Sequence, residues 1–318
     1  MPLRFRYTLH QLRILEAVVD HGGISRAAAA LHLTQPTVSM QIRQLNEALG
    51  VTLFAPKGRG LRLTAAGEEA LAFARGLLTS AERLNERLAA LEGVERGRLR
   101  LSAASTAEYF IPRLIGAFQQ AHAGIAVELK VMSRAAVVAR LREDADDLYV
   151  MAQPPSEDPV VAGAFVDNPL VAIAPAAHVL ATARKVKLAE LVRHEFVLRE
   201  PGAGTRLLTD SFFAARGLAL RTRLELGSNE AIKQAVIGGL GLAVISLHAL
   251  RDELVHHRRI RVLDVVGMPI PSQWHLVRRA DRMPSRVAEA FVAFLAGQAP
   301  HLAAELAQSR ARTTRGAR

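Results

Sequence analysis

The segment Gln35–Leu49, QPTVSMQIRQLNEAL, has the spacing of an amphipathic helix whose two faces differ in chemistry. Its apolar residues recur at steps of four, three and four, which places them on one helical stripe: Val38, Ile42, Leu45 and Leu49. The opposite arc carries small, polar and cationic side chains that can meet base edges and phosphates in a major groove: Pro36, Ser39, Met40 and Arg43. The pattern predicts a recognition helix that enters DNA.

Two shorter helices are expected before this segment. Apolar residues between 9 and 18 predict a first helix that ends near a glycine pair, and Ser25 is expected to cap an alanine-rich second helix over 26–31. A turn at 32–34 follows, and Thr34 is expected to cap the recognition helix. The three helices together predict a helix-turn-helix unit.

A basic wing is expected after the recognition helix. The run VTLFAPKGRGLRLT, residues 51–64, predicts two short strands around Lys57 and Arg59, which would reach the flanking phosphates or the minor groove. The fold of residues 1–64 is therefore predicted to be a winged helix-turn-helix. The expected DNA contacts are Ser25, Gln35, Pro36, Thr37, Ser39, Met40, Arg43, Lys57 and Arg59.

Charge distinguishes this interpretation from plain core packing, which also produces three-helix units with apolar stripes. Residues 1–64 hold eight Lys and Arg against three Asp and Glu, a net charge of +5. Residues 93–300 reach the same excess over more than three times the length. A concentration of positive charge on the helix-turn-helix and wing is typical of a DNA-binding surface.

The segment from Leu9 to Leu71 closely resembles the N-terminal domain of LysR-type transcriptional regulators. The resemblance runs from the first helix through the wing into the helix that follows. Three positions depart from the usual pattern: Asn46 replaces a common Glu, and Ala55 and Pro56 replace a charged residue and an Arg. The wing is therefore expected to hold fewer phosphates than is typical of the family.

Length and composition favour a soluble protein of two or three domains. The chain has 318 residues, is 50% hydrophobic and contains no cysteine, which excludes disulfides, thiolate metal sites and thiol-based redox sensing. Its longest apolar stretch, 235–250, is interrupted by three glycines and is shorter than a bilayer-crossing helix. No apolar segment of a secretion signal follows Arg4 and Arg6. We expect a cytoplasmic protein without contact to a membrane.

A long helix is predicted over residues 65–92. A 3-4 repeat runs along it, as in a coiled-coil seam: Gly67, Ala70, Ala74, Leu77, Ala81, Leu84, Leu88 and Leu91. One interpretation is a helix packed on its own domain. The favoured one is a linker helix that pairs two subunits and places two recognition helices on one side of DNA.

The remaining sequence alternates between strand and helix patterns. Apolar runs such as LRLSA (99–103) and LVAIA (170–174) are separated by helical segments, which predicts parallel sheets covered by helices on both faces. We expect a two-lobed α/β domain over 93–300, with lobe I near 93–162 and 268–300, and lobe II near 163–267. Crossings between the lobes are expected at 160–166 and 260–268. Residues 301–318 are expected to be a basic tail, whose last ten residues, SRARTTRGAR, are expected to be disordered, with nonspecific DNA contact as the alternative.

Three predicted junctions of a strand and a helix could bind an anion between these lobes, because backbone N–H groups and the helix dipole attract negative charge there. They are SAAST (102–106), PGAGTR (201–206) and GSNE (227–230). A Ser or Thr at such a position is usually only an N-cap. Convergence of all three on one cleft favours a ligand site.

The same segments resemble the CbbR subgroup of LysR-type regulators, which controls Calvin-cycle carbon-fixation genes. The resemblance implies a periplasmic-binding-protein-like domain that senses a small anionic metabolite such as a phosphorylated sugar, 2-phosphoglycolate or NADPH. The subgroup often has Lys at Glu108, Ser at Ala203 and Arg at Gln153, so two cations and one hydroxyl are missing here. The predicted effector-binding residues are Ser102, Ser105, Thr106, Gln153, Thr205, Arg206 and Asn229.

The resemblance also implies a double-stranded DNA operator and a homodimer as partners, and it leaves open a tetramer and contact with RNA polymerase. No cofactor is expected, and the adjacent His256 and His257 are expected in a solvated loop rather than a metal site. The alternatives are a LysR-type regulator of another pathway or, from a different class, a two-lobed small-molecule binding protein or enzyme. No nucleophile with its base and no metal triad is evident, so we expect no enzyme.

Overall fold

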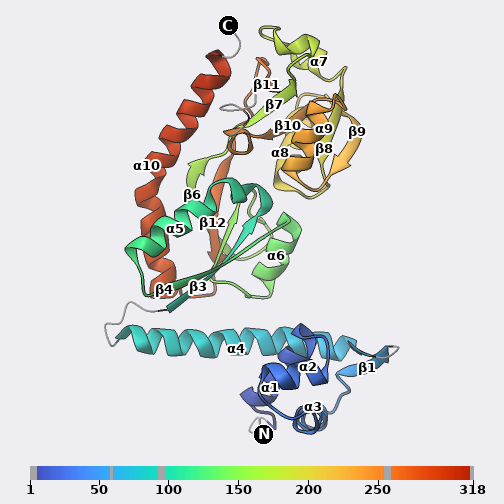
Figure 1. Cartoon of the computed structure of the whole chain (residues 1–318), viewed down its shortest axis with the longest axis vertical. Helices are drawn as coiled ribbons and strands as arrows, with labels where there is room; N and C mark the ends of the chain where they lie inside the picture. Colours follow the sequence, from blue (N-terminus) through green and yellow to red (C-terminus); the bar gives the residue numbers. More distant parts are fainter. Residues whose placement is uncertain (1–5, 58–59, 92–96, 252, 254–258, 316–318) are drawn as a thin grey trace. The chain divides into compact units, whose positions relative to one another are not determined.

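A computed structural model describes residues 6–57, 60–91, 97–251, 253 and 259–315. They form two compact units, an N-terminal one that ends at Val94 and a C-terminal one that holds nearly all the other residues. Figure 1 labels their helices and strands.

Three short helices and a hairpin make up most of the N-terminal unit: α1 (Leu9–Asp20), α2 (Ile24–Ala30), α3 (Gln35–Leu49), β1 (Phe54–Lys57) and β2 (Gly60–Leu63). The predicted stripe of α3 faces inward, since Val38, Ile42 and Leu45 are buried with Leu12, Ile14 and Leu15 of α1. Strands β1 and β2 pair antiparallel. The sequence-based prediction of a winged helix-turn-helix is confirmed.

The caps of α2 and α3 differ from each other. Thr34 caps α3 as predicted, because its side chain accepts a hydrogen bond from the backbone N–H of Thr37 at 3.3 Å. The predicted cap of α2 is wrong: Ser25 lies inside the helix, and the N-cap is Gly23. Gly23 has a φ of 147°, which a residue with a side chain rarely adopts, so the glycine itself sets the start of α2.

The predicted linker helix is α4 (Ala65–Leu91), 27 residues long. Its first turns pack on their own unit: Ala74 is fully buried, and a Cβ on Gly67 would lie 2.1 Å from the carbonyl oxygen of Leu53. Further along, Leu77 and Leu84 are exposed. The first part of the repeat is therefore core, while the exposed Leu77 and Leu84 are consistent with the predicted pairing of two subunits.

Lobe I of the C-terminal unit contains a five-stranded sheet in the order β4-β3-β5-β12-β6. Strands β3, β4 and β5 are parallel, while β12 is antiparallel to both β5 and β6. The elements are β3 (Gly97–Ala104), η1 (Ser105–Tyr109), α5 (Ile111–Ala121), β4 (Ile125–Met132), α6 (Arg134–Arg142), β5 (Leu148–Met151), β6 (Val160–Asp167) and β12 (Gln273–Arg279).

Lobe II holds two small sheets, β10-β7-β11 and β8-β9. The first is antiparallel and the second parallel. Its elements are β7 (Leu170–Pro175), η2 (Val179–Ala181), α7 (Leu188–Leu191), β8 (Glu195–Arg199), α8 (Gly204–Ala214), β9 (Arg221–Leu226), α9 (Asn229–Ile237), β10 (Ala243–Ser246), η3 (Leu247–Leu250) and β11 (Ile260–Val262).

The crossings between the lobes are displaced from their predicted positions. Residues 160–167 form β6, which pairs with β12 along its whole length, so the first crossing lies at Asn168 and Pro169. The second lies at 269–272, where Leu170 and Ile270 exchange backbone hydrogen bonds. Because the outgoing and returning segments run in opposite directions, they pair antiparallel. The sheet of lobe I is therefore mixed rather than parallel as predicted, and in lobe II β8-β9 is parallel while β10-β7-β11 is antiparallel.

Helix α10 (Arg286–Arg315) joins the two lobes on one side of the unit (Figure 1). Its Leu302 belongs to the core of lobe I, and its Leu306 to a core of lobe II. Residues 301–315 of the predicted basic tail are helical because these leucines anchor them, so the disorder predicted from residue 309 onward is wrong as far as Arg315. Within the described residues, 286–309 also have the length and hydropathy of a membrane span, but buried Phe291, Leu295, Leu302 and Leu306 indicate a packed helix.

Candidate DNA-binding and effector-binding sites

The outward arc of α3 presents the predicted DNA contacts. Gln35, Pro36, Met40 and Arg43 are exposed, and Thr37 and Ser39 are half-buried. Within the described part of the chain, Arg43 has no carboxylate in ion-pair range. Its guanidinium is therefore available to a phosphate. Ser25 is exposed near the start of α2.

The backbone pairing of β1 with β2 shows where the wing lies in the chain. Lys57 pairs with Gly60 at the end of the hairpin, while Arg59 lies outside the described residues, as do His256 and His257. Asn46, which replaces a common Glu of the family, accepts a hydrogen bond from the backbone N–H of Leu53 at 3.2 Å. Asn46 thus fixes the approach of the wing to α3.

A buried arginine connects the two lobes of the C-terminal unit. Arg199, at the end of β8 in lobe II, donates to the hydroxyl of Ser105 at 3.1 Å and to that of Thr106 at 3.5 Å, both in lobe I. It also donates to Asn229 Oδ1 at 3.1 Å and pairs with Glu200. Asn229 Nδ2 in turn donates to Thr106 Oγ1 at 2.9 Å.

Three predicted site residues, Ser105, Thr106 and Asn229, therefore meet, but they come from two of the three predicted junctions and they meet around Arg199. The guanidinium of Arg199 is neutralised by Glu200, with distances of 2.7 and 2.9 Å to its two carboxylate oxygens. Sequence analysis missed Arg199. The available signal was a cation directly after the apolar residues of a buried strand, FVL at 196–198.

The other predicted residues lie outside this set of side-chain contacts, although Arg206 donates to the backbone carbonyl of Arg199 at 2.9 Å. Ser102 is fully buried in lobe I and donates to Asp146 at 2.7 Å. Arg206, on the first turn of α8, is paired with Asp210 and Glu225. Thr205, beside it, is buried, and no other described residue is recorded as a hydrogen-bond partner of its hydroxyl.

An acidic edge lies next to the Arg199 network. Tyr109 of lobe I donates to Glu230 of lobe II at 2.8 Å, and the buried Lys233 is paired with Glu230 and Glu253 at 2.6 and 2.8 Å. Partial burial and the nearby Glu230 raise the pKa of Glu108. This edge, where the CbbR subgroup often has a Lys, therefore disfavours an anion.

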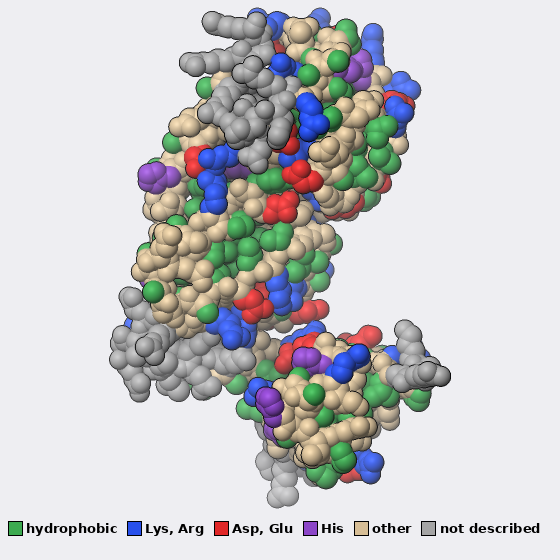
Figure 2. Space-filling model, viewed as in Figure 1, with side chains coloured by type: hydrophobic (Ala, Val, Ile, Leu, Met, Phe, Trp, Pro, Cys, Tyr) green, Lys and Arg blue, Asp and Glu red, His purple; other side chains and the backbone are tan. Residues whose placement is uncertain are grey.

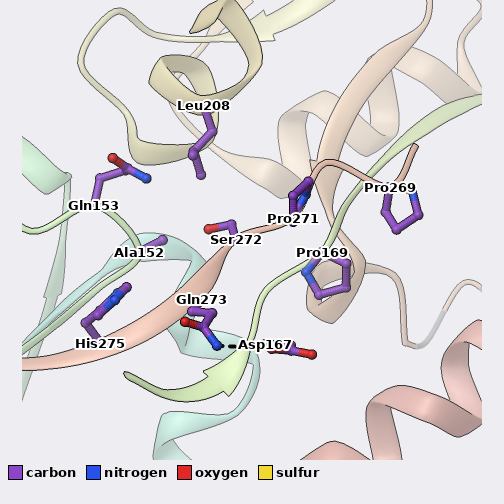
Figure 3. Close-up of a pocket in the computed structure, with 10 residues that line it drawn as sticks. All are labelled: Ala152, Gln153, Asp167, Pro169, Leu208, Pro269, Pro271, Ser272, Gln273 and His275. Atoms are coloured by element: carbon purple, nitrogen blue, oxygen red, sulfur yellow. Dashed lines mark hydrogen bonds between the residues drawn. The ribbon is translucent and has the colours of Figure 1, made fainter. Parts of the chain in front are cut away.

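A cavity of about 460 Å³ lies where the lobes join. Figure 3 shows Gln153 of lobe I and Leu208 of α8 bordering it, with the two crossings along another side. The remaining lining residues are Ala152, Asp167, Pro169, Pro269, Pro271, Ser272, Gln273 and His275. Of the seven predicted effector residues, Gln153 alone lines this cavity.

Two buried polar atoms in the cavity wall lack a hydrogen-bond partner among the described residues: Ser272 Oγ and His275 Nδ1. The Ser272 hydroxyl points into the space between Ala152, Gln153 and Leu208 (Figure 3). Buried polar groups in folded proteins are normally satisfied. A polar ligand in the cavity would supply the hydrogen-bond partners that these two atoms lack. Neither residue was identified from sequence, because no local pattern marks a hinge.

The charge of the C-terminal unit is mixed. On the face seen in Figure 2, Lys and Arg side chains are interspersed with Asp and Glu. This agrees with the small excess of positive over negative residues in 93–300. The same figure shows no single-sign field on this face that could track a DNA backbone. Positive charge is concentrated in residues 1–64 and in the four arginines of the last ten residues, SRARTTRGAR.

A DNA-reading domain joined by a long helix to a two-lobed domain with an interlobe cavity defines a ligand-responsive regulator. Residues 9–68 match the family of bacterial regulatory helix-turn-helix proteins of the lysR type, and residues 92–300 match the LysR substrate binding domain. The chain belongs to the LysR family of transcriptional regulators. Members of this family bind DNA and are not enzymes. The prediction of a DNA-binding regulator and the prediction that the protein is not an enzyme are therefore confirmed.

Relatives with similar sequences are transcriptional regulators, and two of them are named for the RuBisCO operon. The RuBisCO operon transcriptional regulator of Allochromatium vinosum is 45% identical over 93% of this chain and 97% of its own length. The transcriptional activator CmpR of Synechocystis is 39% identical over 91% of this chain and 94% of its own length.

Solved structures agree with the architecture. The regulatory domain of Synechocystis CcmR, in complex with 2-PG, is 39% identical, with a TM-score of 0.62 over 65% of this chain and all of that chain. Full-length CbnR complexed with its target DNA has a TM-score of 0.69 over 91% of this chain and 98% of its own, at 22% identity, and supports the fold alone.

Proposed function

We propose that this protein controls genes of carbon dioxide fixation, binding operator DNA as a cytoplasmic dimer and sensing a small anionic metabolite in the interlobe cavity. The names of its relatives support the target genes, and the CcmR domain with 2-PG supports the class of effector. A tetramer and contact with RNA polymerase belong to the same proposal.

The observation that carries the effector site is the cavity itself. A volume of about 460 Å³ is within the usual range for small-molecule sites. Its wall combines apolar side chains with the unsatisfied Ser272 Oγ and His275 Nδ1. Both lobes and both crossings contribute to it, so a ligand there would favour one arrangement of the lobes.

A gel-shift assay tests the function. We expect the full-length protein to shift DNA from upstream of a RuBisCO operon, and 2-phosphoglycolate, a phosphorylated sugar or NADPH to change the mobility or affinity of the complex. Binding only to DNA upstream of an unrelated operon would instead support a regulator of another pathway. Absence of binding to any promoter DNA would contradict the assignment of α3.

Replacement of Arg43 with Gln should weaken binding to all DNA sequences equally. If Arg43 neutralises one phosphate, the slope of log K against log salt should fall by about 0.9. Arg75→Gln is the matched control, because Arg75 is already paired with Glu16 and Asp20.

By contrast, Gln35→Ala should relax operator discrimination. Unaltered discrimination with measurable binding would mean that α3 docks differently.

Replacement of Thr205 with Val should weaken effector binding at least about tenfold, because a hydrogen bond to a charged ligand group would be lost. Thr209→Val is the control: Thr209 lies one turn further along α8, and its hydroxyl already donates to the carbonyl oxygen of Thr205 at 2.7 Å. Titration calorimetry with 2-phosphoglycolate measures both. DNA affinity without effector should not change, since Thr205 belongs to the other unit.

A further inference from the structure

A histidine of lobe II packs against the core of lobe I close to both crossings. His248 of η3 lies on Phe110 of lobe I, with ring centroids 5.1 Å apart. Phe110 is only 1% exposed, and its ring lies 5.4 Å from that of Trp274, the second residue of β12. The imidazole of His248 is therefore part of the contact between the lobes at the point where the chain passes from one to the other.

Hydrogen bonds hold this contact at the first crossing. His248 Nε2 lies 2.8 Å from the backbone carbonyl oxygen of Asp167, the last residue before the crossing. Because a carbonyl oxygen only accepts, Nε2 carries the proton of the neutral ring and Nδ1 is left with a lone pair. Ser246 Oγ accepts from the backbone N–H of His248 at 3.2 Å and donates to Asn168 Oδ1 at 2.6 Å. The imidazole and the hydroxyl together fix η3 to the crossing.

The charges beside His248 offset one another while its ring is neutral. Three charged side chains act on the ring, from α5, β6 and α10: Arg113, Asp167 and Glu305. Glu305 also binds Arg251, the residue after η3, at 3.1 Å. Strand β10 contributes no titratable residue, and η1 contributes Glu108 and Tyr109, of which Tyr109 donates to Glu230 instead. A proton on His248 would thus add a positive charge to two arginines and two carboxylates that already balance.

We propose that protonation of His248 separates η3 from Phe110 and Asp167, so that the arrangement of the two lobes depends on pH. The imidazolium would lose hydration against the buried Phe110 ring and would be repelled by Arg113. A proton would then act on the same equilibrium between lobe arrangements that an effector biases. The inference goes beyond the proposed function, since it needs neither an effector nor DNA.

The direction of the pH effect follows from the surroundings of the ring. Burial lowers the pKa of His248, and Arg113 acts in the same direction, against Asp167 and Glu305. The neutral ring therefore stabilises the fold above about pH 6.5, where a histidine of the unfolded chain titrates, and this contribution is lost as the pH falls through the lowered pKa. Arg113 holds the pKa of Glu305 below its usual value, so Glu305 stays charged while His248 gains its proton.

Fluorescence of Trp274, the only tryptophan of the chain, tests the proposal in the full-length protein. As the pH falls from about 7.5 to about 5.5, the emission maximum of the wild type should move to longer wavelength, because water reaches a ring that is otherwise 2% exposed. His248→Gln should abolish this shift, since glutamine can still donate to Asp167 but takes up no proton. His122→Gln is the matched control: His122 lies on Phe118 at 4.6 Å within lobe I, and this variant should respond as the wild type does.

Urea unfolding followed by the same fluorescence measures the change in stability. Over this pH interval the unfolding equilibrium constant should rise at least about threefold more in the wild type than in His248→Gln. An equal pH response of His248→Gln and the wild type in either measurement would overturn the inference. Absence of an emission shift in the wild type, or its loss in His122→Gln, would also overturn it. Neither measurement involves DNA or effector, so each of these outcomes leaves the proposed function intact.

Discussion

Replacing Leu84 with Glu should convert the dimer to monomers and abolish operator binding at concentrations where the wild type is fully bound. Leu84 is 57% exposed on α4, and the exposed Leu77 lies two turns before it on the same stripe. In a paired α4 seam both would be buried. A carboxylate in that contact would lose its hydration without gaining a partner, and its symmetry mate would carry the same charge.

The loss should be large because each half-site alone binds weakly, and the dimer gains from engaging both. The N-terminal unit should stay folded, since Leu84 contributes nothing to its core. Ala72→Glu is the control: it adds the same charge at an exposed position roughly 120° around the helix. Sedimentation velocity measures the assembly. An unchanged sedimentation coefficient for Leu84→Glu would reject α4 as the dimer contact.

Replacing Arg199 with Met should lower the free energy of unfolding of the C-terminal unit by about 3 kcal/mol or more, since hydrogen bonds to a buried charge would be lost. The side chain of Arg199 is only 3% exposed. Its removal would leave Asn229 Oδ1 and the hydroxyls of Ser105 and Thr106 without their shared donor. The bonds from Arg199 to lobe I would be lost, while the bond from Asn229 Nδ2 to Thr106 Oγ1 would remain.

Urea unfolding followed by tryptophan fluorescence measures this effect selectively. The chain has a single tryptophan, Trp274, which is 2% exposed in lobe I and reports on the C-terminal unit alone. Arg223→Gln is the matched control, because the exposed pair of Arg223 with Glu195 should contribute no more than about 1 kcal/mol. A loss of that small size in Arg199→Met would show that solvent screens the Arg199 network.

The Arg199 network and the cavity suggest how sensing could work in this chain. Arg199 fixes the lobes to each other through Ser105 and Thr106, while the two crossings pair with each other near the cavity. An effector can shift the arrangement of the lobes only by binding one arrangement more tightly. A ligand in the cavity, whose wall includes Gln153 of lobe I and Leu208 of lobe II, would meet that condition.

The sequence by itself determined the elements whose signal is local and periodic. The stripe of α3, the cap at Thr34, the hairpin and the strands of both lobes follow from residues a few positions apart. Their side chains face one way because helix and strand geometry repeat at fixed intervals. Three junctions, at 102–106, 201–206 and 227–230, were predicted to converge on one cleft, and residues of the first and third meet around Arg199.

Tertiary structure alone decided which polar groups are available to a ligand. Ser102, Ser105, Thr106 and Asn229 have partners inside the protein, while Ser272 Oγ and His275 Nδ1 have none among the described residues. Whether a donor is free depends on residues far away in the chain, and no local pattern encodes that. The same is true of residues 301–315, which are polar and basic by composition but helical because Leu302 and Leu306 reach two separate cores.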